Sequence, residues 1–252
     1  MAELVDAQVS EACCRKAVEV RFFSSAPIFD RRGLTVREGF SVSLTYRQAN
    51  MRSEFLGSVE SQQTHFGVEL SSPQINALAD YFELVQEHNP LLHLVGPCTP
   101  EEFAVRHTLE SLTLLPHLPA NSKFADVGAG AGLPSIPCLI VRADLHATLV
   151  ESKEKKATFL NKALEDLGLA GRAEVVNRQF EETSADDAGF VTCRALDKFL
   201  DKLPRLLKWS GARGLLFFGG AGLGGEMQKR GLNVEATLMP LSERRFLFVT
   251  KK

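Results

Sequence analysis

Three glycines spaced two residues apart follow one short apolar run, and a carboxylate follows the next. The run at 124–127 leads into Gly128-Ala-Gly130-Ala-Gly132, and the run at 146–150 leads into Glu151. Glycines in such a turn let the backbone bend sharply and approach a ligand closely. An acid at the end of a neighbouring strand can hold two ribose hydroxyls. The two segments together predict a nucleoside pocket.

The glycine spacing narrows the class of ligand. A dinucleotide-binding loop has glycine at its first, third and sixth places, whereas the sixth place here is Leu133. The loop is instead similar to that of S-adenosylmethionine (SAM) methyltransferases, so we expect SAM as the cofactor, bound through Asp126, Gly128, Gly130, Gly132 and Glu151. Two plainer interpretations are a turn without a ligand and a Glu151 that only pairs with Lys155 along a helix. The turn without a ligand does not explain the cost of three glycines.

The elements that must position these residues alternate between strand and helix. Strand-like runs lie at 124–127, 146–150, 173–176, 190–193 and 214–218, and helical patterns lie at 134–143, 153–168 and 196–209. This alternation predicts a mostly parallel sheet covered on both faces. The last two runs, 234–238 and 245–249, leave no room for a helix between them and should pair antiparallel. The predicted fold is therefore α/β, doubly wound and Rossmann-like, with a mostly parallel sheet that ends in an antiparallel hairpin, as in SAM-dependent methyltransferases.

Two helices are predicted before the glycine loop. The first begins at Ser72-Pro73, where Ser72 can cap the first turn, and it breaks at Asn89-Pro90. The second begins at the capping box Thr99-Pro-Glu-Glu102 and reaches about Leu115. We expect a helical cap over about 71–118 and a SAM-binding core over about 122–252.

The first fifty residues show no sustained hydrophobic period. Their opening resembles peptides produced when a transfer-RNA gene is translated by mistake, in which case Met51 would be the true start. The alternative is an authentic flexible extension that touches RNA, although its charges are nearly balanced. Such a segment offers little patterned apolar surface to offset the entropy of ordering. We expect a disordered or non-native extension over 1–50 and a methyltransferase domain over 51–252.

Composition excludes several classes of protein. The formal net charge of the 252 residues is −2, so any basic surface must be local. No apolar run approaches the roughly 20 residues that a membrane span needs. The five cysteines are scattered without metal spacing, which indicates reduced thiols in a cytoplasm. We expect a cytoplasmic monomer without a membrane or metal partner.

Polar residues outside the glycine loop form two groups. Arg106, His107, Glu110 and Ser111 share a short stretch of the second helix, where a functional cluster and a surface His–Glu pair are equally compatible with the pattern. The other group is a basic ridge near the fourth strand, where a phosphate-binding surface competes with a solvated helix face. The ridge comprises Arg194, Lys198, Lys202, Arg205 and Lys208. Arg194 differs from the lysines because it lies at the end of a strand.

From about Ser72 onward the sequence resembles the RsmG/GidB family, bacterial methyltransferases that make N7-methylguanosine in small-subunit (16S) ribosomal RNA. The resemblance is carried by Arg106-His107-x-x-Glu110-Ser111, Asp126-Val-Gly-x-Gly-x-Gly-Leu-Pro134, Ile136-Pro137, Leu149-Val-Glu-Ser152, Lys156-x-x-Phe-Leu160, Cys193-Arg194-Ala195 and Glu243-Arg244. It implies SAM contacts at Gly128, Leu133, Gln179, Phe180 and Arg194. It also implies that Arg106, His107 and Ser111, with Arg194, serve the acceptor pocket, and that the partner is the small ribosomal subunit.

Three departures from the family pattern leave alternatives open. Leu92-His-Leu-Val95 stands where Asn-Leu-Thr is usual, Glu110 replaces an aspartate, and Gly219 replaces a lysine. The loss of that lysine could weaken RNA binding or change the target nucleotide. The alternatives are a SAM-dependent methyltransferase for another substrate, a non-catalytic SAM-binding ribosome assembly factor and, least of all, a nicotinamide enzyme.

Overall fold

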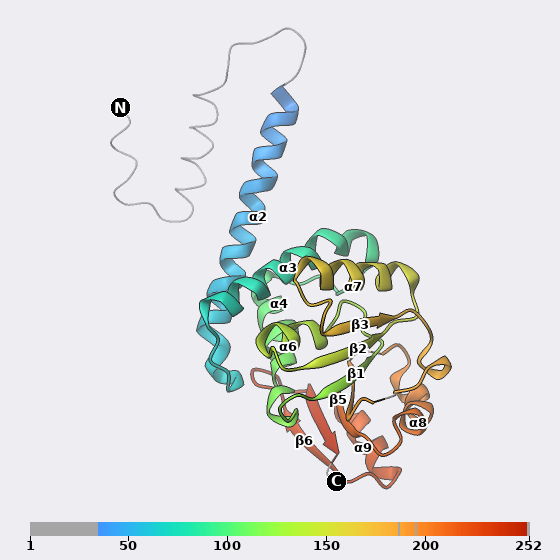
Figure 1. The fold of residues 1–252 in the computed structure, drawn as a ribbon. Coiled ribbons are helices and arrows are strands. Elements are labelled where there is room, and N and C mark those ends of the chain that lie inside the picture. Colours follow the sequence, from blue (N-terminus) through green and yellow to red (C-terminus); the bar gives the residue numbers. More distant parts are fainter. Residues whose placement is uncertain (1–34, 186, 195, 251–252) are drawn as a thin grey trace. The chain divides into compact units, whose positions relative to one another are not determined.

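The computed structural model describes residues 35–185, 187–194 and 196–250. By its contacts the chain divides into residues 1–46 and 47–252, and the second unit contains the sheet. The sheet has seven strands in the order β3-β2-β1-β4-β5-β7-β6 (Figure 1). The strands are β1 (Lys123–Val127), β2 (His146–Val150), β3 (Ala173–Val176), β4 (Phe190–Arg194), β5 (Gly214–Gly219), β6 (Val234–Leu238) and β7 (Phe246–Thr250).

The first five strands are parallel, and the final hairpin is antiparallel, as the sequence predicts. β7 lies between β5 and β6 and pairs antiparallel with both. In the parallel part, Val127 is opposite Val150 on one side and opposite Cys193 on the other. The residues that follow these three positions are Gly128, Glu151 and Arg194. The register therefore brings the predicted site residues together at the carboxyl edge of the sheet.

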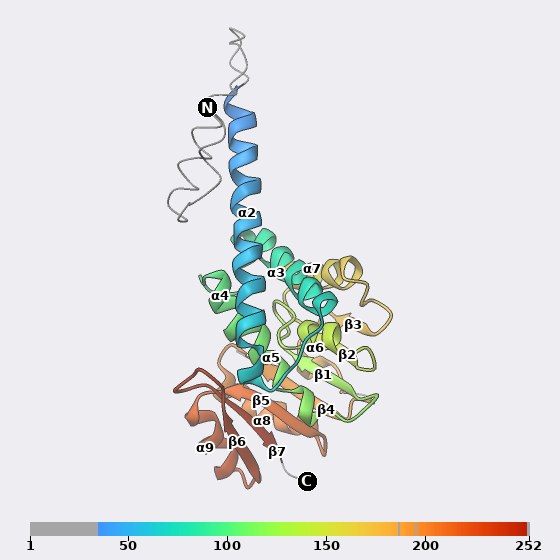
Figure 2. The same cartoon turned by 90° about the vertical axis from the view of Figure 1, so that its left-hand side faces the viewer.

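Alternate side chains along the strands belong to two different apolar clusters. In β5, Leu216 belongs to the cluster that contains residues of α3, α6 and α7, whereas Phe217 belongs to the cluster with α8 and α9. Figure 2 shows α3 and α7 close together, with α8 and α9 at the other end of the domain. Both faces of the sheet are therefore covered, which confirms the doubly wound class. These helices are α3 (Ser72–Leu92), α6 (Ser135–Val141), α7 (Glu154–Asp166), α8 (Phe199–Ser210) and α9 (Ala221–Lys229).

The helical cap differs from prediction in its boundaries. The residue before α3 is Ser71 rather than Ser72, and its backbone N–H donates to the side chain of Gln74 at 2.8 Å. The helix also continues through Pro90 to Leu92. The second predicted helix begins at the Thr99 capping box, which is confirmed by the 3.1 Å bond from the Glu102 N–H to the threonine hydroxyl. It runs as α4 (Pro100–Phe103), a π-helical turn η2 (Ala104–Leu109) and α5 (Glu110–Leu112).

Two features of the C-terminal half differ from the sequence prediction. α9 was not predicted, because its glycines lower helix propensity, yet Leu223 and Met227 are buried on one side of it. In α8 the side chains of Leu203 and Leu206 are fully buried, whereas Leu200 is 50% exposed. The helix begins at Phe199, three residues after the start that the sequence predicts.

Most of the predicted N-terminal extension, residues 1–34, lies outside the described residues. The helix α2 (Thr35–Gln62) occupies the rest of it, where the sequence predicts no regular structure. Once residues 51–62 are helical, extending the helix toward the N-terminus adds one hydrogen bond per residue without a new nucleus. Phe55 is fully buried and its ring stacks on Phe82 of α3 at 4.8 Å. In the part of the chain that the structure describes, no helix meets the length and apolarity needed to cross a bilayer.

Candidate active site

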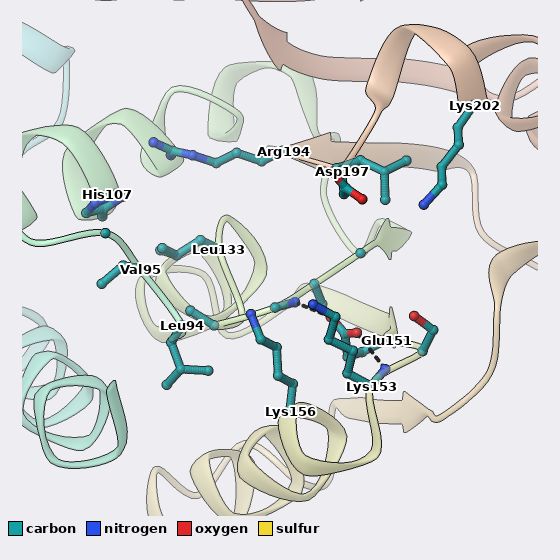
Figure 3. A pocket seen from close by; sticks show the side chains of 17 residues that line it. Leu94, Val95, His107, Leu133, Glu151, Lys153, Lys156, Arg194, Asp197 and Lys202 are labelled. Atoms are coloured by element: carbon teal, nitrogen blue, oxygen red, sulfur yellow. Dashed lines mark hydrogen bonds between the residues drawn. The ribbon is translucent and has the colours of Figure 1, made fainter. Parts of the chain in front are cut away.

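A cavity of about 380 Å³ lies at the carboxyl ends of β1, β2 and β4 (Figure 3). We call it the glycine-loop cavity. Its walls come from the loop after β1, the start of α7, the segment after α3, and the residues around the end of β4. The lining residues are Leu94, Val95, Gly96, His107, Gly128, Ala129, Gly130, Ala131, Leu133, Glu151, Ser152, Lys153, Lys156, Arg194, Leu196, Asp197 and Lys202.

The glycines of the loop have different structural reasons to lack a side chain. Gly130 has φ +57°, and a Cβ there would meet only the Gly128 carbonyl oxygen at 3.7 Å. Gly132 has φ +91°, and a Cβ there would lie 2.4 Å from Ile136 Cδ1. Positive φ is strained for residues with a side chain. Gly130 therefore keeps the floor of the cavity open, whereas Gly132 allows the helix α6 to pack against the loop.

Glu151 is one of two acidic residues on the cavity wall, and Asp197 is the other. Its Oε2 accepts a hydrogen bond from the Gly130 N–H at 2.9 Å, and its Oε1 accepts one from the Lys153 N–H at 2.8 Å. These bonds fix the carboxylate between two loops, and each oxygen keeps a lone pair for a further donor. The alternative pairing of Glu151 with Lys155 along the helix is therefore not what positions this side chain.

Asp126 lies beneath the loop rather than on the cavity wall. It is fully buried, and its Oδ2 accepts a 2.6 Å hydrogen bond from the Ser135 hydroxyl at the start of α6. Its Oδ1 has no hydrogen-bond partner among the described residues. Burial raises the pKa of Asp126 to about 7, opposed in part by the Ser135 bonds. In this arrangement Asp126 fastens the glycine loop to α6.

The remaining predicted cofactor and acceptor residues lie around the cavity. Gln179 is exposed beyond β3, and Phe180 is buried with its ring edge-on to Trp209 at 6.0 Å. Arg106 is exposed and pairs with Glu102 at 3.5 Å. None of these three lines the glycine-loop cavity. Their predicted roles toward SAM or RNA remain predictions.

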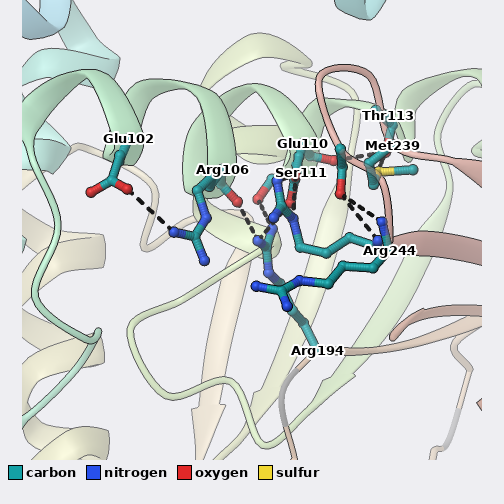
Figure 4. A network of polar contacts seen from close by, with 10 residues as sticks. Glu102, Arg106, Glu110, Ser111, Thr113, Arg194, Met239 and Arg244 are labelled. Atoms are coloured by element: carbon teal, nitrogen blue, oxygen red, sulfur yellow. Dashed lines mark hydrogen bonds and ion pairs between the residues drawn. The ribbon is translucent and has the colours of Figure 1, made fainter. Parts of the chain in front are cut away.

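Glu110 is a buried carboxylate that pairs with two arginines, Arg194 and Arg245. Figure 4 shows Glu110 and Arg194 within one network of polar contacts. Glu110 is 1% exposed, its Oε2 lies 3.1 Å from Arg194 Nη2, and its Oε1 accepts from Arg245 Nε at 2.7 Å. Glu110 is therefore not the surface partner of His107 that the spacing allowed. The π-helical turn before it adds a residue to the turn and changes which side chains share a face.

Arg194 is held from several sides. One of its nitrogens, Nη1, donates to the Ser111 hydroxyl at 3.3 Å, and Nη2 donates to the backbone carbonyl of Arg106. Its guanidinium carbon lies 5.2 Å from the centre of the Phe218 ring, a cation–π distance. Ser111 in turn donates to the carbonyl of His107. The structure therefore connects the four predicted acceptor-site residues, with Arg106 and His107 contributing their backbone carbonyls rather than their side chains.

His107 is kept neutral by its surroundings. Burial, followed by the positive charges of Arg194, Arg106 and Arg245, lowers the pKa of His107 to about 3. Its ring packs on Phe103 at 5.2 Å, and its Nδ1 has no hydrogen-bond partner among the described residues. A neutral imidazole can position a polar ligand by hydrogen bonding but carries no charge at physiological pH.

A second cavity of about 530 Å³ adjoins the first, and we call it the arginine hollow. It shares His107, Arg194 and Leu196 with the glycine-loop cavity. Its other walls are aromatic, aliphatic and glycine residues together with Glu110 and Arg245. These are Phe199, Leu200, Phe218, Gly219, Gly220, Gly222, Leu223 and Phe246.

Several lining residues were not predicted as site residues. Lys153 and Lys156 line the glycine-loop cavity, and neither is among the site residues predicted from the sequence. Lys156 also donates to the carbonyl of His93 at 3.1 Å, which connects α7 to the segment after α3. Leu94 and Val95 lie in the segment that departs from the family pattern.

Comparison with known proteins shows the family of the chain. The model of the GidB family, described as rRNA small subunit methyltransferase G, matches residues 74–242. The chain belongs to the GidB family. Proteins named ribosomal RNA small subunit methyltransferase G from Yersinia pestis (strain Pestoides F) and Yersinia pseudotuberculosis (serotype O:1b, strain IP 31758) are 37% identical to it over 148 residues, which cover 59% of this chain and 71% of each relative.

The comparison with a solved structure supports the fold alone. The structure of the mitomycin 7-O-methyltransferase MmcR is similar to this chain with a TM-score of 0.50 and 17% sequence identity, over 77% of this chain and 67% of that chain. The GidB match begins in α3 and ends before β7, so it includes the glycine loop, Glu151 and Arg194. Helix α2 and Arg245 lie outside the matched residues.

Proposed function

We propose that this GidB family member transfers a methyl group from SAM to N7 of a guanosine in 16S ribosomal RNA. The observation that carries the proposal is the contact between the two cavities, which share His107, Arg194 and Leu196. A cofactor in the glycine-loop cavity and a base in the arginine hollow would meet at these residues. The small ribosomal subunit is the proposed partner, and we place the enzyme in the cytoplasm with it.

The residues of the glycine-loop cavity fit SAM. Glu151 offers carboxylate lone pairs for the ribose hydroxyls, beyond the two backbone bonds that already orient it. The open space at the Cβ position of Gly130 admits close approach of a ligand to the loop. Leu133, Leu94 and Val95 supply the apolar part of the wall. When bound there, SAM would supply an electrophilic methyl group.

The arginine hollow suits an unstacked purine. A base entering it would lie among Phe199, Phe218 and Phe246, and an RNA base must leave its stack to reach such a site. Guanine N7 keeps a free lone pair in the neutral base, so the protein need not remove a proton before transfer. The network accordingly contains a neutral His107 and no evident base-and-acid pair. The residues act by alignment, which alone can contribute strongly to rate.

The direct test is the transfer of labelled methyl from SAM to small ribosomal subunits that lack N7-methylguanosine. The proposal expects label in N7-methylguanosine at one position. SAM binding without transfer would favour a non-catalytic assembly factor, and turnover on free metabolites would favour another substrate. Either outcome would contradict the proposed activity.

Two variants test the two cavities separately, one through SAM binding and the other through methyl transfer. Gly130→Val should abolish SAM binding, because a β-branched residue at φ +57° is strained and intrudes on the cavity. Normal SAM affinity in that variant would contradict the proposal that SAM binds in the glycine-loop cavity. Arg194→Ala should reduce methyl transfer strongly, since it empties the centre of the shared network. Gly57→Val, at a helical glycine whose Cβ would meet nothing within 4 Å, is the matched control for the valine.

A further inference from the structure

The arginine hollow carries a second arginine whose role is not explained by the network around Arg194. Arg245, just before β7, places Nε and Nη2 at 2.7 and 2.6 Å from the same oxygen of Glu110. That carboxylate is already paired with Arg194. One carboxylate balances one guanidinium, so the trio leaves one unit of positive charge on the wall of the hollow. Partly buried charge without compensation is costly, which indicates an anionic ligand at this wall.

The two arginines differ in how much of their hydrogen-bonding capacity remains. Arg194 is 12% exposed and donates to Ser111, to Glu110 and to the Arg106 carbonyl. Arg245 is 30% exposed, and in the described residues its Nη1 makes no hydrogen bond. A guanidinium presents five N–H groups in a planar fork. Arg245 is therefore the one of the pair that can reach a ligand without breaking the network.

Arg245 also lies next to a position on the neighbouring strand that has no side chain. Gly219 of β5 is paired in register with Phe246, the residue after Arg245. Gly219 supplies no side chain to the hollow, and both Gly219 and Arg245 line it. Cationic side chains on this wall therefore come from β4 and from the approach to β7, and none comes from β5.

Resting on the proposed function, we propose that Arg245 binds a phosphate of the RNA strand that carries the acceptor guanosine, with Glu110 as its positioning residue. Glu110 fixes the orientation of the guanidinium and leaves its outer edge toward the hollow. An arginine fork matches the geometry of a phosphate and forms charge-assisted hydrogen bonds with it. Bidentate contact with guanine itself would occupy N7, the atom that must stay free.

The test compares Arg245→Gln with the wild-type full-length protein in methyl transfer to small subunits. KM for the subunit should rise about tenfold, as expected for one charge-assisted contact. The slope of log KM against log salt should flatten by about 0.7 to 0.9. KM for SAM and kcat at saturating subunit should stay unchanged. Arg230→Gln, which breaks an exposed 2.8 Å pair with Glu226 away from both cavities, should leave all four values as they are.

The lysine variant covers the case in which the glutamine variant does not fold, which melting and SAM calorimetry would reveal. Arg245→Lys keeps the charge but loses the fork, so it should keep the salt slope while KM for the subunit rises a few-fold. A wild-type subunit KM in either variant, or an unchanged salt slope in Arg245→Gln, overturns the inference. Absence of transfer by the wild-type protein would instead contradict the proposed function.

Discussion

The hydroxyl of Tyr81 in α3 donates a 2.9 Å hydrogen bond to the backbone carbonyl of Ala131 in the glycine loop. Tyr81 is fully buried, and burial raises the pKa of its phenol, so the group remains a donor at any physiological pH. The helical cap is thereby attached to the loop that forms the floor of the glycine-loop cavity. The cap therefore helps to set the shape of the cavity.

Tyr81→Phe tests this attachment. The variant leaves the Ala131 carbonyl without its buried donor, which costs about 1–3 kcal/mol. We expect a lower melting temperature and a several-fold weaker affinity for SAM, measured by calorimetry. Ser58→Ala removes an exposed 2.8 Å hydrogen bond within α2 and is the control. An unchanged SAM affinity in Tyr81→Phe would show that the loop holds its shape without the cap.

Glu151→Gln tests the acid at the end of β2. An amide has one acceptor oxygen and places its NH₂ group toward either the Gly130 or the Lys153 N–H. It also removes the charge proposed to hold the ribose hydroxyls. SAM affinity should fall at least about tenfold, which corresponds to roughly 1.4 kcal/mol. Glu165→Gln changes an exposed carboxylate of α7 and should bind SAM normally. Equal affinities in the two variants would exclude Glu151 from the cofactor site.

The raised pKa of Asp126 predicts how the stability of the folded protein depends on pH. Its pKa is about 7 in the folded protein, against an ordinary value of 3.8. Between these values the folded state keeps a proton that the unfolded state has released. The free energy of unfolding therefore falls by roughly 1 kcal/mol per pH unit as pH rises through this window. Above about pH 7 it levels off.

Asp126→Asn removes this titration. Urea unfolding from pH 5 to pH 8 should show the wild-type protein losing stability relative to the variant. Asp166→Asn, which alters an exposed carboxylate paired with Lys162, should follow the wild-type curve. Parallel curves for wild type and Asp126→Asn would mean that the buried carboxylate is already ionised at pH 5.

The strands were predictable because buried parallel strands are short apolar runs, and their boundaries differ from prediction by one residue at most. The helix α9 was not, since Gly222, Gly224 and Gly225 all disfavour a helix. A Cβ at Gly224 would lie 2.3 Å from the Phe248 ring, so the glycine there allows the helix to pack on β7. The packing of α9 on β7 thus overrides the local preference of the glycines against a helix.

The polar network around Glu110 likewise depends on contacts that local sequence patterns do not show. The position of Arg194 at a strand end was visible in the sequence. Its partner Glu110 is 84 residues away, and Arg245 lies 135 residues from Glu110. Helical spacing left a functional cluster and a surface pair with His107 equally compatible with the pattern, because no local pattern shows a π-helical turn or a buried ion pair between distant segments. The glycine loop was easier to find, because its residues are adjacent in sequence.

Gly219→Lys tests whether a further cation on the wall of the arginine hollow, beside Arg194 and Arg245, strengthens RNA binding. A Cβ at this position would lie 2.6 Å from Leu223 Cδ2, the end of a flexible side chain, so we expect a loss of about 1–3 kcal/mol in stability. KM for the subunit should fall and its salt dependence should steepen by about 0.7 to 0.9, with SAM affinity unchanged. Gly225→Lys adds the same charge on α9 outside the hollow and should change neither value. If the two lysine variants behave alike, the effect is one of overall charge, and the wall around Gly219 does not face the RNA.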